Sequence, residues 1–174
     1  GLRNFHREEI LKKLFFKINE IRKKSNFNKF FLLKVSPDLE NSNIPGIINI
    51  ILENKIDGVI LTNTTDKNRE NLQGKNSNEK GGLSGKPIKD ISTQFVRRFY
   101  KDLKGKVPII GVGGVDSGES AFEKIAAGAS AVQLYTGLIY KGPTIIKDIK
   151  KELINILKNK GFKNIKEAIG SDSN

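Results

Sequence analysis

Two kinds of hydrophobic pattern alternate along the chain. Residues repeated at helical spacing predict helices, and short continuous hydrophobic runs between them predict strands. Hydrophobic residues recur at helical spacing on one face from Glu9 to Ile21. Later segments with the same spacing predict helices that begin near Asn43, at Asp90, at a cap formed by Asp116 or Ser117, at Pro143-Thr144, and at Ile165. Compact hydrophobic runs between them predict buried parallel strands at 30–35, 56–61, 107–112 and 131–134. Residues 66–80 are charged and aperiodic, and this length is typical of a functional or mobile loop.

This order, one helix followed by four strand–helix units, is typical of a parallel sheet with right-handed crossovers. The carboxyl ends of such strands share one rim, where barrel enzymes place their chemistry. Four units make half of an eight-stranded barrel, and an isolated half has two open edges and an unfilled interior. We therefore predict an α/β fold, the second half of a TIM (β/α)8 barrel. Residues 1–174 would be the carboxy-terminal half of one domain whose amino-terminal half is absent. An open doubly wound sheet is the alternative.

Composition excludes several classes of site. The chain has no cysteine, so it forms no disulfide, thiolate metal site or cysteine nucleophile. Its single histidine, His6, is expected at the surface, which argues against a histidine metal cluster or a Ser-His-Asp triad. The net charge of +12 is scattered over polar helix faces without zinc-finger spacing, and this favours solubility and steering over nucleic-acid binding.

The chain begins with Gly1 and contains no methionine, so we expect a piece of a longer polypeptide or a processed product. No hydrophobic run approaches the roughly 20 residues of a membrane helix, and no signal peptide is visible. Any targeting segment is expected upstream.

Glycines at the ends of the last two strands indicate a phosphate site. Gly113 and Gly114 follow the third strand, and the fourth strand ends at Tyr135 and Thr136. Glycine lets the backbone approach a ligand closely, and free N–H groups there can hold a phosphate. In α/β barrels the phosphate site follows the last two strands. A tight turn is the simpler interpretation of the glycines alone.

Polar residues after the first two strands are further candidates. Lys34 ends a hydrophobic strand, where it either extends to the rim or presents a fixed positive charge to an electron-rich ring or anion. Thr62, Asn63 and Thr64 offer neutral donors and acceptors that suit an imide or carboxylate, or they form a capping turn. Asp38 could serve as a base, although its place after a proline favours a turn.

Five motifs together resemble one family. They are LKVSPDL (33–39), IDGVILTNTT (56–65), GGLSGKPI (81–88), VPIIGVGGV (107–115) and GASAVQLYT (128–136). In this order they resemble dihydroorotate dehydrogenase, most closely its membrane-associated, quinone-linked class. The resemblance covers nearly the whole chain, from Gly1-Leu2-Arg3 to Glu167-Ala168-Ile169-Gly170.

The resemblance implies an FMN-containing barrel that oxidises dihydroorotate to orotate in pyrimidine biosynthesis and passes electrons to a quinone. It implies that Lys34 contacts the flavin ring and that Thr62 also touches the cofactor. Asn63 and Thr64 would bind orotate or dihydroorotate. The FMN phosphate and ribityl chain would be held, largely through backbone N–H groups, by Gly85, Gly114, Tyr135 and Thr136. Gly113 and Ser84 would line the same region.

The chain also departs from the family. The serine that acts as base in quinone-linked members would lie upstream of Gly1, as would the helices of the quinone tunnel and membrane contact. We therefore assign no catalytic base here, and Lys34, Asn63 and Thr64 would position and stabilise. We expect the chain alone to be inactive and to need its amino-terminal half, from the same polypeptide or a second chain. A eukaryotic member would lie at the mitochondrial inner membrane.

Two alternatives remain at this stage. The chain could be half of another phosphate-binding barrel, such as an isomerase of histidine or tryptophan synthesis. Such enzymes need carboxylates at strand ends, where only Asp38 is placed. It could also be a non-catalytic module that binds FMN or phosphate, although such a module has no need of Lys34 and Asn63.

Overall fold

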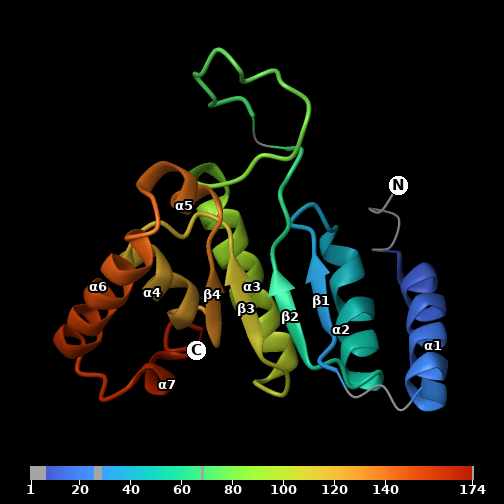
Figure 1. Ribbon diagram of the computed structural model, residues 1–174. Helices are drawn as coiled ribbons and strands as arrows, with labels where there is room; N and C mark the ends of the chain where they lie inside the picture. Colours follow the sequence, from blue (N-terminus) through green and yellow to red (C-terminus); the bar gives the residue numbers. More distant parts are fainter. Residues whose placement is uncertain (1–6, 26–28, 68, 174) are drawn as a thin grey trace.

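A computed structural model describes residues 7–25, 29–67 and 69–173, so His6 and the Gly1-Leu2-Arg3 segment lie outside the described residues. The elements, shown in Figure 1, are α1 (Glu8–Ser25), β1 (Leu32–Val35), the 3-10 turn η2 (Asn41–Asn43), α2 (Ile44–Glu53), β2 (Gly58–Leu61), the 3-10 turn η3 (Lys86–Ile88), α3 (Lys89–Leu103), β3 (Ile109–Val112), α4 (Gly118–Ala126), β4 (Ala131–Gln133), α5 (Thr136–Lys141), α6 (Ile145–Asn159) and α7 (Ile165–Ala168). Among the described residues, no helix is both long and apolar enough to cross a bilayer.

The strands form one parallel sheet in the order β1-β2-β3-β4, with β1 and β4 at its edges. This confirms the predicted helix followed by four parallel strand–helix units, and the arrangement is part of an α/β barrel. All four strands run the same way, so their carboxyl ends lie at one rim (Figure 1). The loop between β2 and η3 projects beyond that rim, and α5 lies beside it.

Strand register separates two faces of the sheet, since neighbouring side chains along a strand point to opposite sides. Val35 of β1 pairs with Leu61 of β2, and both side chains are fully buried against the helices. One position earlier, Lys34 pairs with Ile60 and Ile60 with Ile110, and this row is exposed or half-buried. We call the face that carries this row the open face. It corresponds to the unfilled interior predicted for half a barrel.

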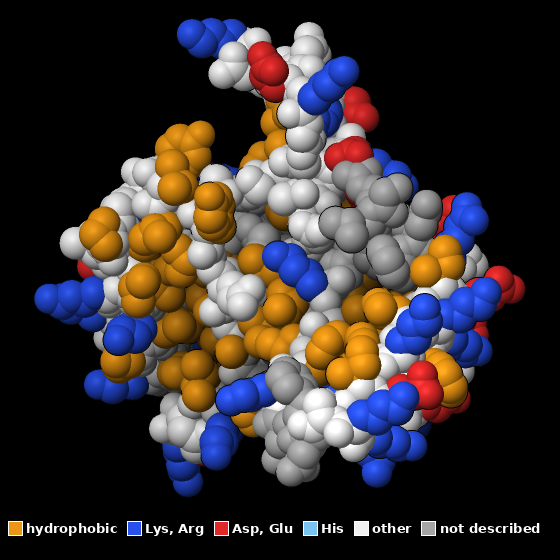
Figure 2. Space-filling model, turned by 45° about the vertical axis from the view of Figure 1, so that its right-hand side comes forward, with side chains coloured by type: hydrophobic (Ala, Val, Ile, Leu, Met, Phe, Trp, Pro, Cys, Tyr) orange, Lys and Arg blue, Asp and Glu red, His pale blue; other side chains and the backbone are white. Residues whose placement is uncertain are grey.

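The molecular surface shows the same division between hydrophobic and charged regions. Figure 2 shows a face on which hydrophobic side chains spread over a partly hollowed area, with most charged side chains toward its edges. Large hydrophobic side chains with high exposure are Phe16, Ile21, Phe30, Leu32, Tyr135, Ile139, Tyr140, Ile146, Ile154 and Ile165. A hydrophobic area of this kind is typical of a surface that another polypeptide covers.

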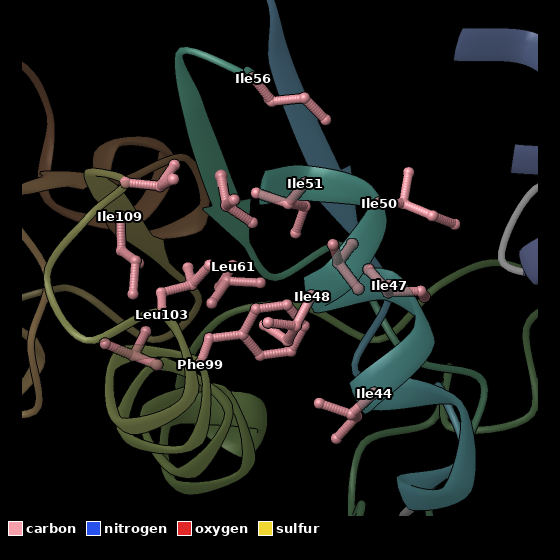
Figure 3. Close-up of a cluster of buried hydrophobic side chains, with 14 of the residues drawn as sticks. Ile44, Ile47, Ile48, Ile50, Ile51, Ile56, Leu61, Phe99, Leu103 and Ile109 are labelled. Carbon is pink, nitrogen blue, oxygen red and sulfur yellow. The ribbon is translucent and has the colours of Figure 1, made fainter. Parts of the chain in front are cut away.

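Two hydrophobic cores hold the helices onto the sheet. In the larger one, isoleucines of α2 such as Ile47 and Ile51 pack with Leu61 and with Phe99 of α3 (Figure 3). Each such side chain contributes about 1.5–3 kcal/mol on burial. The smaller core joins α4 to α6 around Ala121 and also includes Ala168 of α7. The rim is therefore supported by a continuous helical layer behind the sheet.

Element ends differ from the sequence predictions in a few places. β1 begins at Leu32 rather than Phe30, whose side chain is 89% exposed. Ser117, rather than Asp116, caps α4, because its Oγ accepts a hydrogen bond from Ser120 N at 3.2 Å. α5 was not predicted, since six residues are too few to show a helical repeat.

Candidate functional site

Two glycines end β3 in backbone conformations that other residues rarely adopt. Gly113 has φ of 117° and Gly114 has φ of 73°, and both residues are buried. A Cβ on Gly114 would lie 2.5 Å from Lys89 Cβ, and a Cβ on Gly113 would lie 2.8 Å from Ser92 Oγ. The first turn of α3 therefore lies directly against this loop and leaves no room for a side chain.

The loop that precedes η3 reaches the end of β4. Ser84 Oγ and Thr136 Oγ1 share a hydrogen bond of 2.9 Å, and a Cβ on Gly85 would lie 2.8 Å from Thr136 Cγ2. Gly137 in turn packs against Val115, since a Cβ there would lie 2.8 Å from Val115 O. These contacts bring together the predicted residues at 84–85, 113–114 and 136. The Tyr135 side chain, by contrast, is exposed.

Backbone donors are available in this region. Within the described part of the chain, the N–H groups of Gly85, Gly113, Gly114 and Thr136 donate to no protein acceptor. Buried N–H groups normally have partners, and unpaired N–H groups beside glycines suit an anion. We call these four residues the glycine cradle. Its donors and close backbone packing fit a phosphate group.

The end of β2 is tied to both neighbouring strands. Thr62 N donates to Val112 O at 3.0 Å, and Asn63 N donates to Val35 O at 2.8 Å. The Thr62 side chain is buried, and its Oγ1 donates to Asn63 O at 2.9 Å. The polar cluster is thus fixed at the rim by backbone bonds, which leaves most side-chain capacity of Asn63 for a ligand.

The side chains of this cluster are accessible. Asn63 is exposed, and its Oδ1 accepts a hydrogen bond from Thr64 N at 2.9 Å. Its Nδ2 group remains a possible donor to a ligand oxygen. Lys34 is also exposed and lies on the open face, so its ammonium is not enclosed within this chain. The rim beyond the cradle thus carries Lys34 near the end of β1, and Asn63 and Thr64 just after β2.

Asp38, considered above as a base, is engaged by the chain itself. Its carboxylate accepts hydrogen bonds from Thr65 Oγ1 and, at 3.2 Å, from Asp66 N. Thr65 also exchanges two backbone hydrogen bonds with Leu83, of 3.2 and 2.7 Å. Asp38 therefore anchors the base of the projecting loop, which agrees with the turn interpretation.

The projecting loop is ordered from within by one guanidinium. Arg69 donates from Nη1 to Glu79 O at 2.8 Å and to Ser77 O at 3.3 Å, and from Nη2 to Gly81 O. The predicted aperiodic segment thus has a defined internal scaffold. It is positioned next to Thr64, because a Cβ on Gly82 would overlap the Thr64 side chain.

Sequence reasoning missed a group of buried polar residues behind the glycine cradle. Ser92 and Lys124 are both fully buried, and the pKa of Lys124 is lowered to about 8, chiefly by burial. Beside them, Lys89 forms an ion pair with Glu123 at 3.0 Å, and this hydrogen bond raises the pKa of Lys89. The available signal was spacing, since Lys124 follows Ala121 by three residues on the hydrophobic side of α4.

Comparison with known proteins gives consistent results. The family model described as dihydroorotate dehydrogenase matches residues 1–157. The mouse protein named dihydroorotate dehydrogenase (quinone), mitochondrial, is 45% identical over 174 residues, which cover 99% of this chain and 44% of the mouse protein. The dihydroorotate dehydrogenase (quinone) of Trichodesmium erythraeum is 43% identical over 178 residues, covering 98% of this chain and 46% of that protein.

Solved structures agree with this comparison. The crystal structure of ligand-free DHODH from Eimeria tenella superposes with a TM-score of 0.91 and 35% sequence identity, covering 99% of this chain and 52% of that one. The chain therefore spans about half the length of the relatives that it matches.

Proposed function

Because this chain belongs to the dihydroorotate dehydrogenase family, we propose that it is the carboxy-terminal half of an FMN-dependent, quinone-linked dihydroorotate dehydrogenase. The complete enzyme would oxidise dihydroorotate to orotate in pyrimidine (UMP) biosynthesis. The observation that best supports the proposal is the glycine cradle at the ends of β3 and β4, whose N–H groups are available to an anion. The name of the mouse relative, which is described as mitochondrial, supports a mitochondrial location if the source is eukaryotic.

FMN, when bound, supplies the chemistry of accepting a hydride and passing electrons onward. The cradle of Gly85, Gly113, Gly114 and Thr136 would hold its phosphate, with Ser84 and the Tyr135 backbone beside it. Thr62 would line the cofactor site, and the exposed ammonium of Lys34 would place positive charge at the flavin ring. A fixed positive charge favours electron density that develops on such a ring.

Asn63 and Thr64 would position the substrate. The Asn63 amide offers both donors and acceptors, which suits the imide and carboxylate groups of orotate. The proton-accepting base is not assigned within these residues and is proposed upstream of Gly1. The quinone would bind through the amino-terminal region.

The first test concerns dependence on the other half of the barrel. The 174-residue chain should not reduce a dye with dihydroorotate as donor, whereas the chain combined with its amino-terminal half should bind FMN and turn over. Robust turnover by the chain alone contradicts the dependence. A reassembled protein without a flavin absorption band contradicts the FMN assignment.

A second test separates the enzyme from a non-catalytic flavin module. In the reassembled protein, Asn63→Ala should weaken orotate binding about tenfold or more and leave the FMN content unchanged, because a hydrogen-bonding contact to the ligand is lost. Asn49→Ala is the matched control, since Asn49 is exposed on α2, away from the rim. Failure of the unsubstituted protein to bind orotate favours the module. The isomerase alternative has no support, because the chain belongs to another family and Asp38 anchors a loop.

A further inference from the structure

The glycine cradle is built on buried polar contacts from α3 and α4. Ser92, in the first turn of α3, is fully buried, and its Oγ lies 3.0 Å from Gly113 O and 2.9 Å from Lys89 O. Both oxygens are acceptors, whereas a serine hydroxyl has a single hydrogen to donate. Which acceptor receives that hydrogen decides how firmly the cradle is held.

Lys124 shifts this competition toward Gly113. Its Nζ, fully buried between α3 and α4, donates to Lys89 O at 2.9 Å and also to Thr93 Oγ1. Thr93 Oγ1 itself donates to Lys89 O at 2.8 Å. The Lys89 carbonyl therefore has a charged donor and a hydroxyl donor already, so the hydroxyl hydrogen of Ser92 is best used by Gly113 O.

The bond to Gly113 O has a directional consequence. The Gly113–Gly114 peptide is trans, and in a trans peptide the C=O and the following N–H point in opposite directions. When Ser92 holds Gly113 O toward α3, the N–H of Gly114 must point away from α3. That N–H is one of the cradle donors without a protein partner.

We infer that Ser92 and Lys124 are positioning residues, which aim the Gly114 N–H at the phosphate through the Gly113 carbonyl. The inference rests on the proposed function, because it concerns the same phosphate site. Neither side chain touches the ligand. Without them the Gly113–Gly114 peptide can rotate, since glycine has little steric restraint, and the phosphate loses one oriented, charge-assisted donor.

The experiment compares FMN with riboflavin, which lacks the phosphate. Flavin-free complete barrel is titrated with each compound, and binding is followed by quenching of flavin fluorescence. Ser92→Ala should weaken FMN about tenfold and change riboflavin less than about twofold, as expected for one charge-assisted hydrogen bond. Lys124→Met should weaken FMN severalfold with the same selectivity, which provides a second variant if Ser92→Ala does not fold.

Ser173→Ala is the matched control. Ser173 is also buried, and its Oγ donates to a backbone carbonyl, Ala127 O, at 3.0 Å, but it lies near the carboxy terminus and its backbone N–H donates to Gly170 O. This variant should lose similar stability and bind both flavins normally. Equal losses for FMN and riboflavin in Ser92→Ala, or an unchanged FMN affinity, would overturn the inference while the proposed function stands. Failure of the unsubstituted barrel to bind FMN would overturn the proposed function and the inference with it.

Discussion

At the scale of single residues, Lys124 stands out among the described residues as a charged side chain that is fully buried. A lysine ammonium enclosed between two helices loses its hydration, and this loss is the main cause of its lowered pKa, about 8 against the ordinary value of 10.5. The nearby charges act in both directions, because Glu123 and Asp90 favour the ammonium and Lys89 disfavours it. The hydrogen bonds to Lys89 O and Thr93 Oγ1 partly offset the cost of burial.

The lowered pKa predicts a specific pH dependence of stability. Below pH 8 Lys124 is charged in the folded and unfolded chain alike, and its burial destabilises the fold. Between pH 8 and 10.5 the unfolded chain holds one more proton than the folded chain, so stability rises with pH, by about 3 kcal/mol in total. Urea unfolding should show this rise in the natural protein relative to Lys124→Met. Lys150→Met, at an exposed position of α6, keeps Lys124, so its stability should rise with pH as that of the natural protein does. A constant difference between the natural protein and Lys124→Met across this range contradicts the assignment.

The close packing behind Gly114 predicts an unequal effect of two similar substitutions. Gly114 and Gly105 have nearly the same φ, 73° and 71°, but only Gly114 has atoms of Lys89 within 2.7 Å of a built Cβ. Gly105→Ala should cost about 1 kcal/mol from backbone strain alone. Gly114→Ala should cost at least about 2 kcal/mol and also abolish FMN binding. Denaturant unfolding measures the stability that each variant loses. Equal losses of stability in the two variants would show that packing against α3 is unimportant.

At the scale of elements, the sequence predicts the fold well. For the site, it indicates the residues at the rim but not the buried polar residues behind them. The α2 helix and the strands are correct in type because their hydrophobic repeats are long or compact, as at Ile47 to Ile51. The rim residues were predicted because they follow strands directly, and their roles stay predictions. Ser92 and Lys124 were not found, because their roles depend on contacts between helices that are distant in sequence. Periodicity reports which face is buried but not which polar group shares it.

The projecting loop shows how one side chain can order a segment without a hydrophobic core. Arg69→Ala should leave the midpoint of global unfolding within about 1 °C, since the loop is exposed and contributes little packing. It should speed amide hydrogen exchange at Ser77 and Glu79 several-fold, because their turns lose the guanidinium that joins three carbonyls. Lys75→Ala, at an exposed loop position, should leave that exchange unchanged. Unaltered exchange in Arg69→Ala would mean that the turns hold the loop by themselves.

At the scale of the whole molecule, the sheet has helices behind one face and an open face in front. The row formed by Lys34, Ile60 and Ile110 is part of that open face. In a closed barrel this row would be interior and would pack in layers. The hydrophobic side chains seen on the molecular surface fit the same role (Figure 2). Shape and surface chemistry thus both support a partner of complementary half-barrel form.

This arrangement predicts a substitution whose cost depends on the partner. Ile60→Thr should destabilise the 174-residue chain by less than about 1 kcal/mol, because Ile60 is only half-buried there. In the complete barrel the same change should cost about 2 kcal/mol or more, since a hydroxyl would then be enclosed in a packed interior. Unfolding midpoints of both forms provide the comparison. A similar cost in both forms would place this row outside any shared interior.

The sequential order of the strands also bears on how the protein is made. After β1, each strand pairs with the one translated just before it, so the ribosome delivers β2, β3 and β4 in turn to an edge that already exists. Nascent chains of this kind can assemble step by step from the exit tunnel outward, without waiting for distant residues to appear.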